Sequence, residues 1–161
     1  MPTVTASRSI GAAQAQVWAV LADIANAGRW NQAWSKMEIT SPQTHGAGTT
    51  FRAHTADGEA WDFLVSDWIA PEYIAFSPIR DQSERYQITL ESQAFRLKPL
   101  GADQTLVELS ARASARGLRG RVVGLLFWPG YQKHGLNAAL GALHDVVVPH
   151  EEGEPDSEAA L

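Results

Sequence analysis

The sequence predicts an α+β domain in which a curved, seven-stranded antiparallel sheet wraps around a long C-terminal helix, with short helices after the first strand. Segments in which apolar and polar residues alternate fill the middle of the chain, and an amphipathic helical segment follows them. A sheet of this size must cover one face with an apolar partner, and the last helix is the only element long enough to do so. The length of 161 residues fits a single domain.

The first strand and the first helix are predicted by two different periodicities. Residues 3–10 alternate as a half-buried strand does. In the following segment Val17, Val20, Leu21 and Ile24 recur at helical spacing and form one apolar stripe. The remaining strands are expected over residues 36–41, 49–56, 59–69, 73–78, 83–97 and 105–113.

The sixth strand and the C-terminal helices have features of their own. Apolar residues are even-numbered up to Leu90 and odd-numbered from Phe95, which predicts a bulge near residues 91–93. Residues 118–128 are predicted to be helical, and Pro129-Gly130 is expected to break or restart the helix. The last helix, over residues 131–148, carries its apolar stripe at Leu136, Leu140, Leu143 and Val147.

Strand alternation predicts which side chains face the interior. If Phe51 and Phe63 point inward, Arg52 and Asp62 point outward, because successive side chains lie on opposite faces of a strand. The last strand repeats this pattern over residues 107–113. The inner wall should therefore hold few ionisable groups, and general acid–base catalysis needs at least one near the substrate. His54 would reach the interior only if the register moved by one residue.

The charge distribution predicts an acidic, disordered tail over residues 149–161 and a neutral domain over residues 1–148. The tail holds five acidic residues, and the other 13 acidic residues match the 13 Lys and Arg. A neutral body lacks the basic face of a nucleic-acid binder, so no nucleic-acid partner is expected. The N-terminal residues form no apolar run typical of a signal peptide, and no stretch reaches the ~18 apolar residues of a membrane span. A cytoplasmic protein without stable membrane insertion is expected.

Metal and thiol chemistry find no support in the sequence. There is no cysteine, and the five histidines lack the spacing of a metal site. We therefore expect no metal and no cofactor.

Several short motifs, in a specific order, resemble the START-related helix-grip superfamily (SRPBCC), in its polyketide cyclase/dehydrase-like branch. The matching motifs are Ile10 to Val17-Trp18, Leu21-Ala22-Asp23, Arg29-Trp30-Asn31, Gly46-Ala47-Gly48, Trp68-Ile69-Ala70-Pro71, and Phe95-Arg96-Leu97-Lys98-Pro99 before Asp103-Gln104-Thr105. The chain departs from the family at Ala12-Ala13, where proline is common, and at His144, where lysine is common. The resemblance implies a helix-grip fold over about residues 3–148 and a cavity for lipids, polyketides or other hydrophobic compounds. It does not transfer an activity, because one fold hosts many functions.

The leading hypothesis is that the chain binds a hydrophobic small molecule (a lipid, a polyketide or an aromatic compound) in this internal cavity. The residues expected to contact it are Trp30, Trp34, Phe51, Trp61, Phe63, Phe76, Tyr86, Phe95, His134, Leu136 and Leu140. No catalytic residue is assigned.

Two other functions stay open. A polyketide cyclase- or aromatase-like enzyme would use polar groups near the cavity mouth, with Arg80, Arg85, Tyr86 and His134 as candidates, while Asn31 and Asn137 are further polar neighbours. A protein-interaction module would use the outer face of the sheet. The basic and apolar segment 116–128 leaves three alternatives: a lid or packing element, a membrane-surface contact, or a homodimer contact.

Overall fold

The computed structural model describes residues 3–31, 33–79, 88–126 and 128–148, and shows the predicted helix-grip α+β fold. Seven strands form one antiparallel sheet in the order β1-β7-β6-β5-β4-β3-β2. The strands are β1 Thr3–Ile10, β2 Lys36–Ile39, β3 Thr50–His54, β4 Ala60–Ile69, β5 Tyr73–Pro78, β6 Ile88–Gly101 and β7 Gln104–Ala115. The expected tail over residues 149–161 lies outside the described residues.

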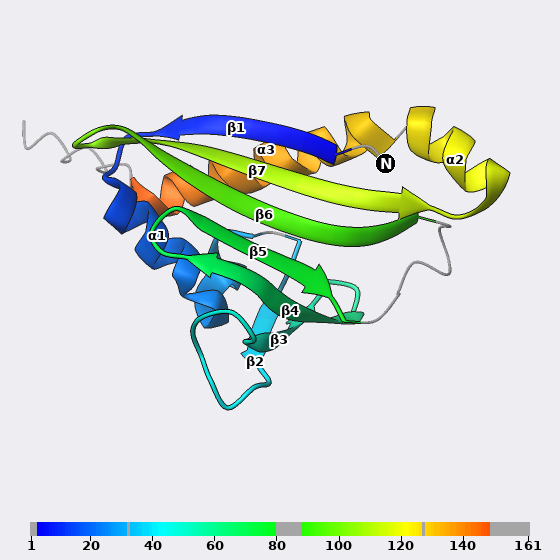
Figure 1. The fold of residues 1–161 in the computed structure, drawn as a ribbon, viewed down its shortest axis with the longest axis horizontal. Helices are drawn as coiled ribbons and strands as arrows, with labels where there is room; N and C mark the ends of the chain where they lie inside the picture. Colours follow the sequence, from blue (N-terminus) through cyan, green and yellow to red (C-terminus); the bar gives the residue numbers. More distant parts are fainter. Residues whose placement is uncertain (1–2, 32, 80–87, 127, 149–161) are drawn as a thin grey trace, which may run out of the picture.

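The long helix α3 (Trp128–Val147) crosses behind the sheet and packs on β1 and β7 (Figure 1). Its leucines Leu136, Leu140 and Leu143 are buried, as the stripe in the sequence predicts. The helix starts three residues earlier than expected. Pro129 is accommodated because the first turn of a helix needs no backbone N–H donors.

The segment after β1 divides into two short helices. Helix α1 covers Gln14–Ala22, and a 3₁₀ helix, η1, covers Ile24–Arg29. Asp23 separates them with a non-helical backbone, and its carboxylate accepts a hydrogen bond of 2.8 Å from the Asn26 side chain. The apolar stripe predicts one helix through Ile24, and the structure instead divides this helix at Asp23. Helix η1 packs against β2 and thereby closes the end of the sheet far from β1.

The predicted bulge in the sixth strand is present, since the pairing of β6 with β7 shifts between Leu90 and Ser92. Another shift, between Val65 and Asp67 of β4, was not predicted, although the core-facing residues change there from the odd-numbered Phe63 and Val65 to the even-numbered Trp68. Inward-facing residues on both sides of the β6 bulge remain part of one continuous core.

Two buried threonines hold the loops around the sheet. Thr105 is fully buried, and its hydroxyl donates a 2.8 Å hydrogen bond to the carbonyl of Ala12, which joins β7 to the β1–α1 connection. Thr49 is equally buried and donates to the carbonyl of Gly46 at 2.8 Å. That turn requires glycine at positions 46 and 48, where φ is 86° and 91°. Among the described helices, none has the length and apolar character to cross a membrane.

Candidate functional site: an aromatic pocket

A pocket lies between the concave face of the sheet and the segment formed by α1, η1 and β2. Its floor comes from four neighbouring strands, because β3, β4, β5 and β6 each turn at least one apolar side chain toward it. The lining residues are Leu21, Ile24, Ala27, Trp30, Asn31, Trp34, Met37, Phe51, Phe63, Ile74, Phe76 and Phe95.

The aromatic side chains of the pocket contact one another in a continuous series. Phe51 and Phe63, directly paired across β3 and β4, stack with ring centroids 5.3 Å apart. Phe76 meets both rings edge-on at 5.9 Å, and Trp34 meets Phe63 edge-on at 5.5 Å. Trp30 packs edge-on against Phe95 at 5.6 Å. Offset and edge-to-face pairs are the preferred arrangements of aromatic rings, so this wall is well packed.

The exposure of the lining residues shows where the pocket meets solvent. Trp30, Phe51, Phe63, Ile74 and Phe95 are buried and form its deep part. The half-buried members are Asn31, Trp34, Met37 and Phe76. The mouth therefore lies between the η1–β2 segment and the middle of β5.

The cavity volume is about 30 Å³. Pockets that hold drug-sized ligands measure roughly 300–1,000 Å³. Since the volume is small, a ligand with even one ring can enter only if side chains at the mouth move. Met37 is suited to such movement because its side chain is unbranched and flexible.

Two of the lining residues, Trp30 and Asn31, carry a polar side-chain group. Trp30 is only 4% exposed, and its indole Nε1 has no hydrogen-bond partner among the described residues. An unpaired buried donor costs about 1–3 kcal/mol. Asn31 lies at the mouth, where its Oδ1 accepts a 3.2 Å hydrogen bond from the backbone N–H of Ala33.

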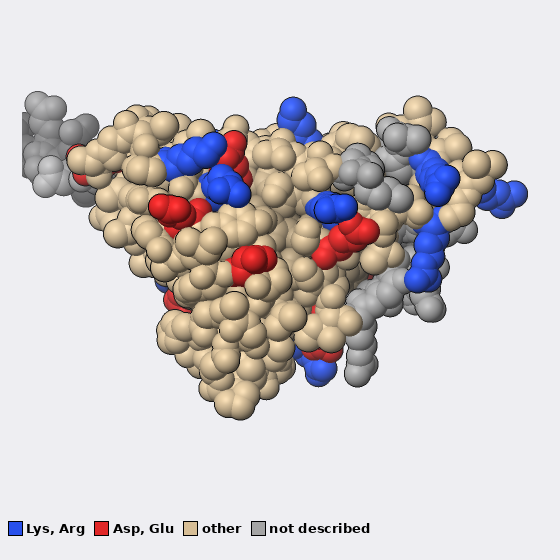
Figure 2. Space-filling view, in the orientation of Figure 1, with Lys and Arg blue, Asp and Glu red and all other residues tan. Residues whose placement is uncertain are grey.

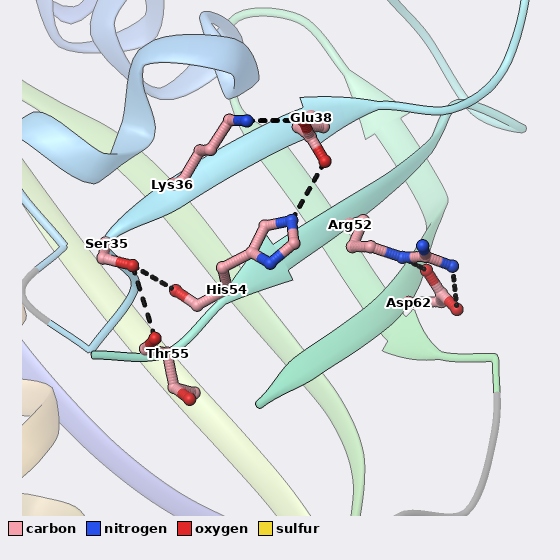
Figure 3. A network of polar contacts seen from close by, with 7 residues as sticks. All are labelled: Ser35, Lys36, Glu38, Arg52, His54, Thr55 and Asp62. Atoms are coloured by element: carbon pink, nitrogen blue, oxygen red, sulfur yellow. Dashed lines mark hydrogen bonds and ion pairs between the residues drawn. The ribbon is translucent and has the colours of Figure 1, made fainter. Parts of the chain in front are cut away.

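Charged side chains of β2, β3 and β4 alternate with the pocket residues and therefore lie on the opposite face of the sheet. Figure 3 shows their polar contacts. Glu38 bridges Lys36 at 2.7 Å and His54 at 2.9 Å, and Arg52 binds Asp62 at 2.8 Å and 3.2 Å. The hydrogen bonds from Lys36 and then His54 lower the pKa of Glu38 to about 2. The salt bridge with Asp62 raises the pKa of Arg52. His54 thus lies on the outer face, as strand alternation predicts, and does not enter the pocket.

The structure brings together six of the eleven residues expected to contact a ligand: Trp30, Trp34, Phe51, Phe63, Phe76 and Phe95. Trp61 lies outside the lining and supports it, since it stacks on Phe63 at 6.3 Å. Arg80, Arg85 and Tyr86 lie outside the described residues.

The three expected contacts on α3 do not line this pocket. Leu136 and Leu140 are buried, but they pack in the core where α3 meets the sheet, and neither lines the pocket. His134 is exposed on the same helix, and so is Asn137. An apolar stripe shows that a helix face is buried, but it does not show whether that face borders a cavity or solid core.

Five lining residues were missed: Leu21, Ile24, Ala27, Met37 and Ile74. Leu21 and Ile24 were recognised as an apolar stripe but not as part of a pocket. Met37 alternates with the outward-facing Lys36 and Glu38 on β2, and this alternation is a signal that could have identified it.

The pocket is chemically suited to holding an apolar ring. None of the lining residues in the described part of the chain is titratable, so these residues offer no general acid or base. Within the same part of the chain, His, Asp and Glu form no group of three able to hold a metal ion.

Comparison with known proteins supports the same family as the sequence motifs do. Residues 1–148 match the family model described as "Polyketide cyclase / dehydrase and lipid transport". No curated protein is significantly similar to the chain in sequence.

Solved structures with the same fold are distant in sequence. The protein XoxI from Bacillus cereus is 19% identical with a TM-score of 0.67, and the alignment covers 91% of this chain and 98% of that one. Truncated norcoclaurine synthase from Thalictrum flavum is 17% identical with a TM-score of 0.68, and the alignment covers 93% of this chain and 95% of that one. The Aha1 dimer from Colwellia psychrerythraea is 16% identical with a TM-score of 0.65, and the alignment covers 91% of this chain and 96% of that one. At these identities the likeness shows the fold alone. The family model covers nearly the whole chain, and the resemblance to the SRPBCC superfamily is confirmed: this chain belongs to the polyketide cyclase/dehydrase and lipid transport family.

Proposed function

We propose that the chain binds a small apolar molecule with at least one flat ring, in the pocket between η1, β2 and strands β3–β6. The observation that carries the proposal is the continuous aromatic wall, in which Trp34 and Phe76 are left half-buried at the mouth. Flat apolar surfaces stack favourably on such rings. Family membership supports a ligand-binding domain without identifying the ligand.

The ligand we propose also carries a hydrogen-bond acceptor, such as a carbonyl oxygen. The unpaired Nε1 of Trp30 supports this, because in an otherwise apolar pocket an acceptor on the ligand would supply the bond that the described residues do not. A polyketide-derived or simple aromatic ketone has both features. A saturated acyl chain has no ring to stack and gains less from the wall.

An enzymatic role receives less support than binding. Norcoclaurine synthase shares the fold, but its identity to this chain is too low to carry an activity over. The described pocket residues include no titratable group, and His134 is exposed on α3 away from the pocket. Cyclase-like catalysis therefore stays an alternative that depends on Arg80, Arg85 and Tyr86.

The proposal is tested with the uncharged dye N-phenyl-1-naphthylamine, whose fluorescence rises in an apolar site. The wild-type protein should bind it with a stoichiometry of one, and Trp34→Ala should weaken binding about tenfold because one stacking surface is lost.

Trp68→Ala is the matched control. Trp68 is also half-buried and also packs edge-on against a tryptophan, Trp18 at 5.3 Å, as Trp34 does against Trp61 at 6.1 Å. Trp68 is not part of the pocket lining. Equal dye affinity in the two variants, or no binding by the wild-type protein, would show that the pocket is not the site.

A further inference from the structure

Helix α2 (Gly117–Leu126) presents an apolar stripe to solvent. Leu118 is 80% exposed, Val122 51% and Leu126 70%. Their spacing of four residues places them on one side of the helix. Gly120, which falls on the opposite side, is buried. Among the described side chains of the helix, Gly120 therefore faces the body while Leu118, Val122 and Leu126 face outward.

Arginines flank this stripe on both sides. At 100° per residue, Arg119 lies to one side of the line from Leu118 to Leu126 and Arg121 to the other, and both are exposed. We call Leu118, Arg119, Arg121, Val122 and Leu126 the α2 patch. Residues 109–144 contain five Lys and Arg and no Asp or Glu, although the whole chain has a net charge of −5. Figure 2 shows basic side chains without acidic neighbours at the end of the molecule where α2 lies.

The α2 patch is far from the aromatic pocket. In Figure 1, α2 stands off the end of the sheet beside the start of α3, whereas α1 and β2 lie toward the other side of the molecule. Helix α2 contacts α3 and β7, and none of its described side chains lines the pocket. A lid over this pocket is thus not its role.

We propose that the α2 patch docks the protein on the surface of an anionic lipid membrane. Aliphatic side chains enter the boundary between headgroups and acyl chains, while arginines on either side bind lipid phosphates. This arrangement lies on the surface and needs no membrane-spanning helix. Tyr131, one turn into α3 and 79% exposed, adds an amphipathic ring of the kind enriched at membrane interfaces.

Other partners fit the α2 patch less well. A second copy that packed on the same stripe would bring two pairs of arginines together, which like-charge repulsion opposes. A nucleic acid would match the arginines, but it would leave three exposed aliphatic side chains against a polar backbone. A membrane with anionic lipids satisfies both the charge and the apolar surface.

The first test is co-sedimentation of the full chain with phosphatidylcholine vesicles with and without phosphatidylglycerol. Binding should require phosphatidylglycerol and fall as NaCl rises. Each arginine near an anionic surface is worth roughly a fivefold change in partitioning, so Arg119→Gln with Arg121→Gln should reduce binding about 25-fold. Leu118→Ser with Leu126→Ser should also reduce it severalfold.

Matched controls come from exposed residues elsewhere. Ile69 and Leu100 are 56% and 54% exposed, and Ile69→Ser with Leu100→Ser should leave binding unchanged. Arg29→Gln, at an exposed arginine of η1, is the control for charge. The proposal is overturned if the wild-type chain does not bind anionic vesicles at low salt, or if the control variants lose binding as much as the patch variants do.

A second test locates the contact. Because the chain has no cysteine, Val122→Cys and Leu100→Cys each give a single attachment point for an environment-sensitive fluorophore. Phosphatidylglycerol vesicles should shift the label at position 122 to the blue and leave the label at position 100 unchanged. A shift at position 122 that follows protein concentration without lipid would show self-association instead, and a shift with duplex DNA equal to that with vesicles would show general anion binding; either result overturns the proposal.

Discussion

At the scale of single residues, the buried hydroxyl of Thr105 makes the clearest contribution to stability. Its hydrogen bond to the carbonyl of Ala12 is buried, so removing the donor leaves that carbonyl without it. Thr105→Val keeps the shape of the side chain and should lower the free energy of unfolding by about 1–3 kcal/mol. Urea denaturation measures this change. Thr105→Ser, which keeps the hydroxyl, should lower the free energy of unfolding by less. An equal decrease in both variants would show that the effect comes from packing and not from the hydrogen bond.

Trp30 is the residue expected to select among ligands of equal size. If its Nε1 donates to the ligand, 2-acetonaphthone should bind about fivefold more tightly than 2-ethylnaphthalene, which corresponds to roughly 1 kcal/mol for one hydrogen bond. In Trp30→Phe the donor is absent and this preference should disappear, whatever happens to the absolute affinities. Displacement of N-phenyl-1-naphthylamine gives both constants. If Trp30→Phe still binds 2-acetonaphthone more tightly than 2-ethylnaphthalene, another group of the protein donates the hydrogen bond to the carbonyl oxygen.

At the scale of elements, the edge strand β2 is attached to β3 by backbone pairing and by charges on the outer face. Lys36 and His54 both bind Glu38, and the pKa of Glu38 falls to about 2 from 4.5. A lowered pKa stabilises the folded state above pH 4.5, and this contribution is lost as the pH falls from 4.5 toward 2.

Lys36→Met tests this coupling, since the hydrogen bond from Lys36 is the largest cause of the shift. The pKa of Glu38 should rise toward 4.5 in a side-chain carboxyl NMR titration. Lys98→Met, which removes a separate ion pair with Glu108 at 3.2 Å, should leave the pKa of Glu38 at about 2. An unchanged Glu38 in Lys36→Met would assign its low pKa to His54.

The elements also show how far the sequence predicts the molecule. Strand alternation placed Phe51 and Phe63 inside and Arg52 and Asp62 outside, because a period of two leaves each strand only two choices. The ends of the helices were less predictable. The break at Asp23 divides one expected helix into α1 and η1, and α3 begins at Trp128, three residues before its expected start, with Pro129 in its first turn at the expected restart.

Only part of the pocket could be predicted from the sequence, for a related reason. The sheet side of the pocket follows from alternation, but its other side depends on how η1 and β2 fold back over the strands, and no local period encodes that path. Leu140 and Leu21 have the same helical signature in the sequence. Only the tertiary arrangement puts Leu21 beside the pocket and leaves Leu140 out of its lining, although both belong to the same core cluster.

At the scale of the whole molecule, the small cavity makes ligand binding a conformational step. With about 30 Å³ free, an aromatic ligand must displace side chains at the mouth, and the cost of that opening reduces the apparent affinity. The bound state nevertheless stabilises the fold, because a ligand that binds only the folded chain shifts unfolding by mass action.

N-phenyl-1-naphthylamine at a hundredfold excess over its dissociation constant should therefore raise the free energy of unfolding by about 2.7 kcal/mol. For a domain of this size that corresponds to a rise in Tm of roughly 5–11 °C, which differential scanning calorimetry measures. At the same dye concentration the rise should be smaller in Trp34→Ala, since a weaker site is less saturated, and unchanged in Trp68→Ala. A Tm that stays constant or falls would mean that the dye binds the unfolded chain as well as the folded one, and that the aromatic wall serves packing rather than ligand binding.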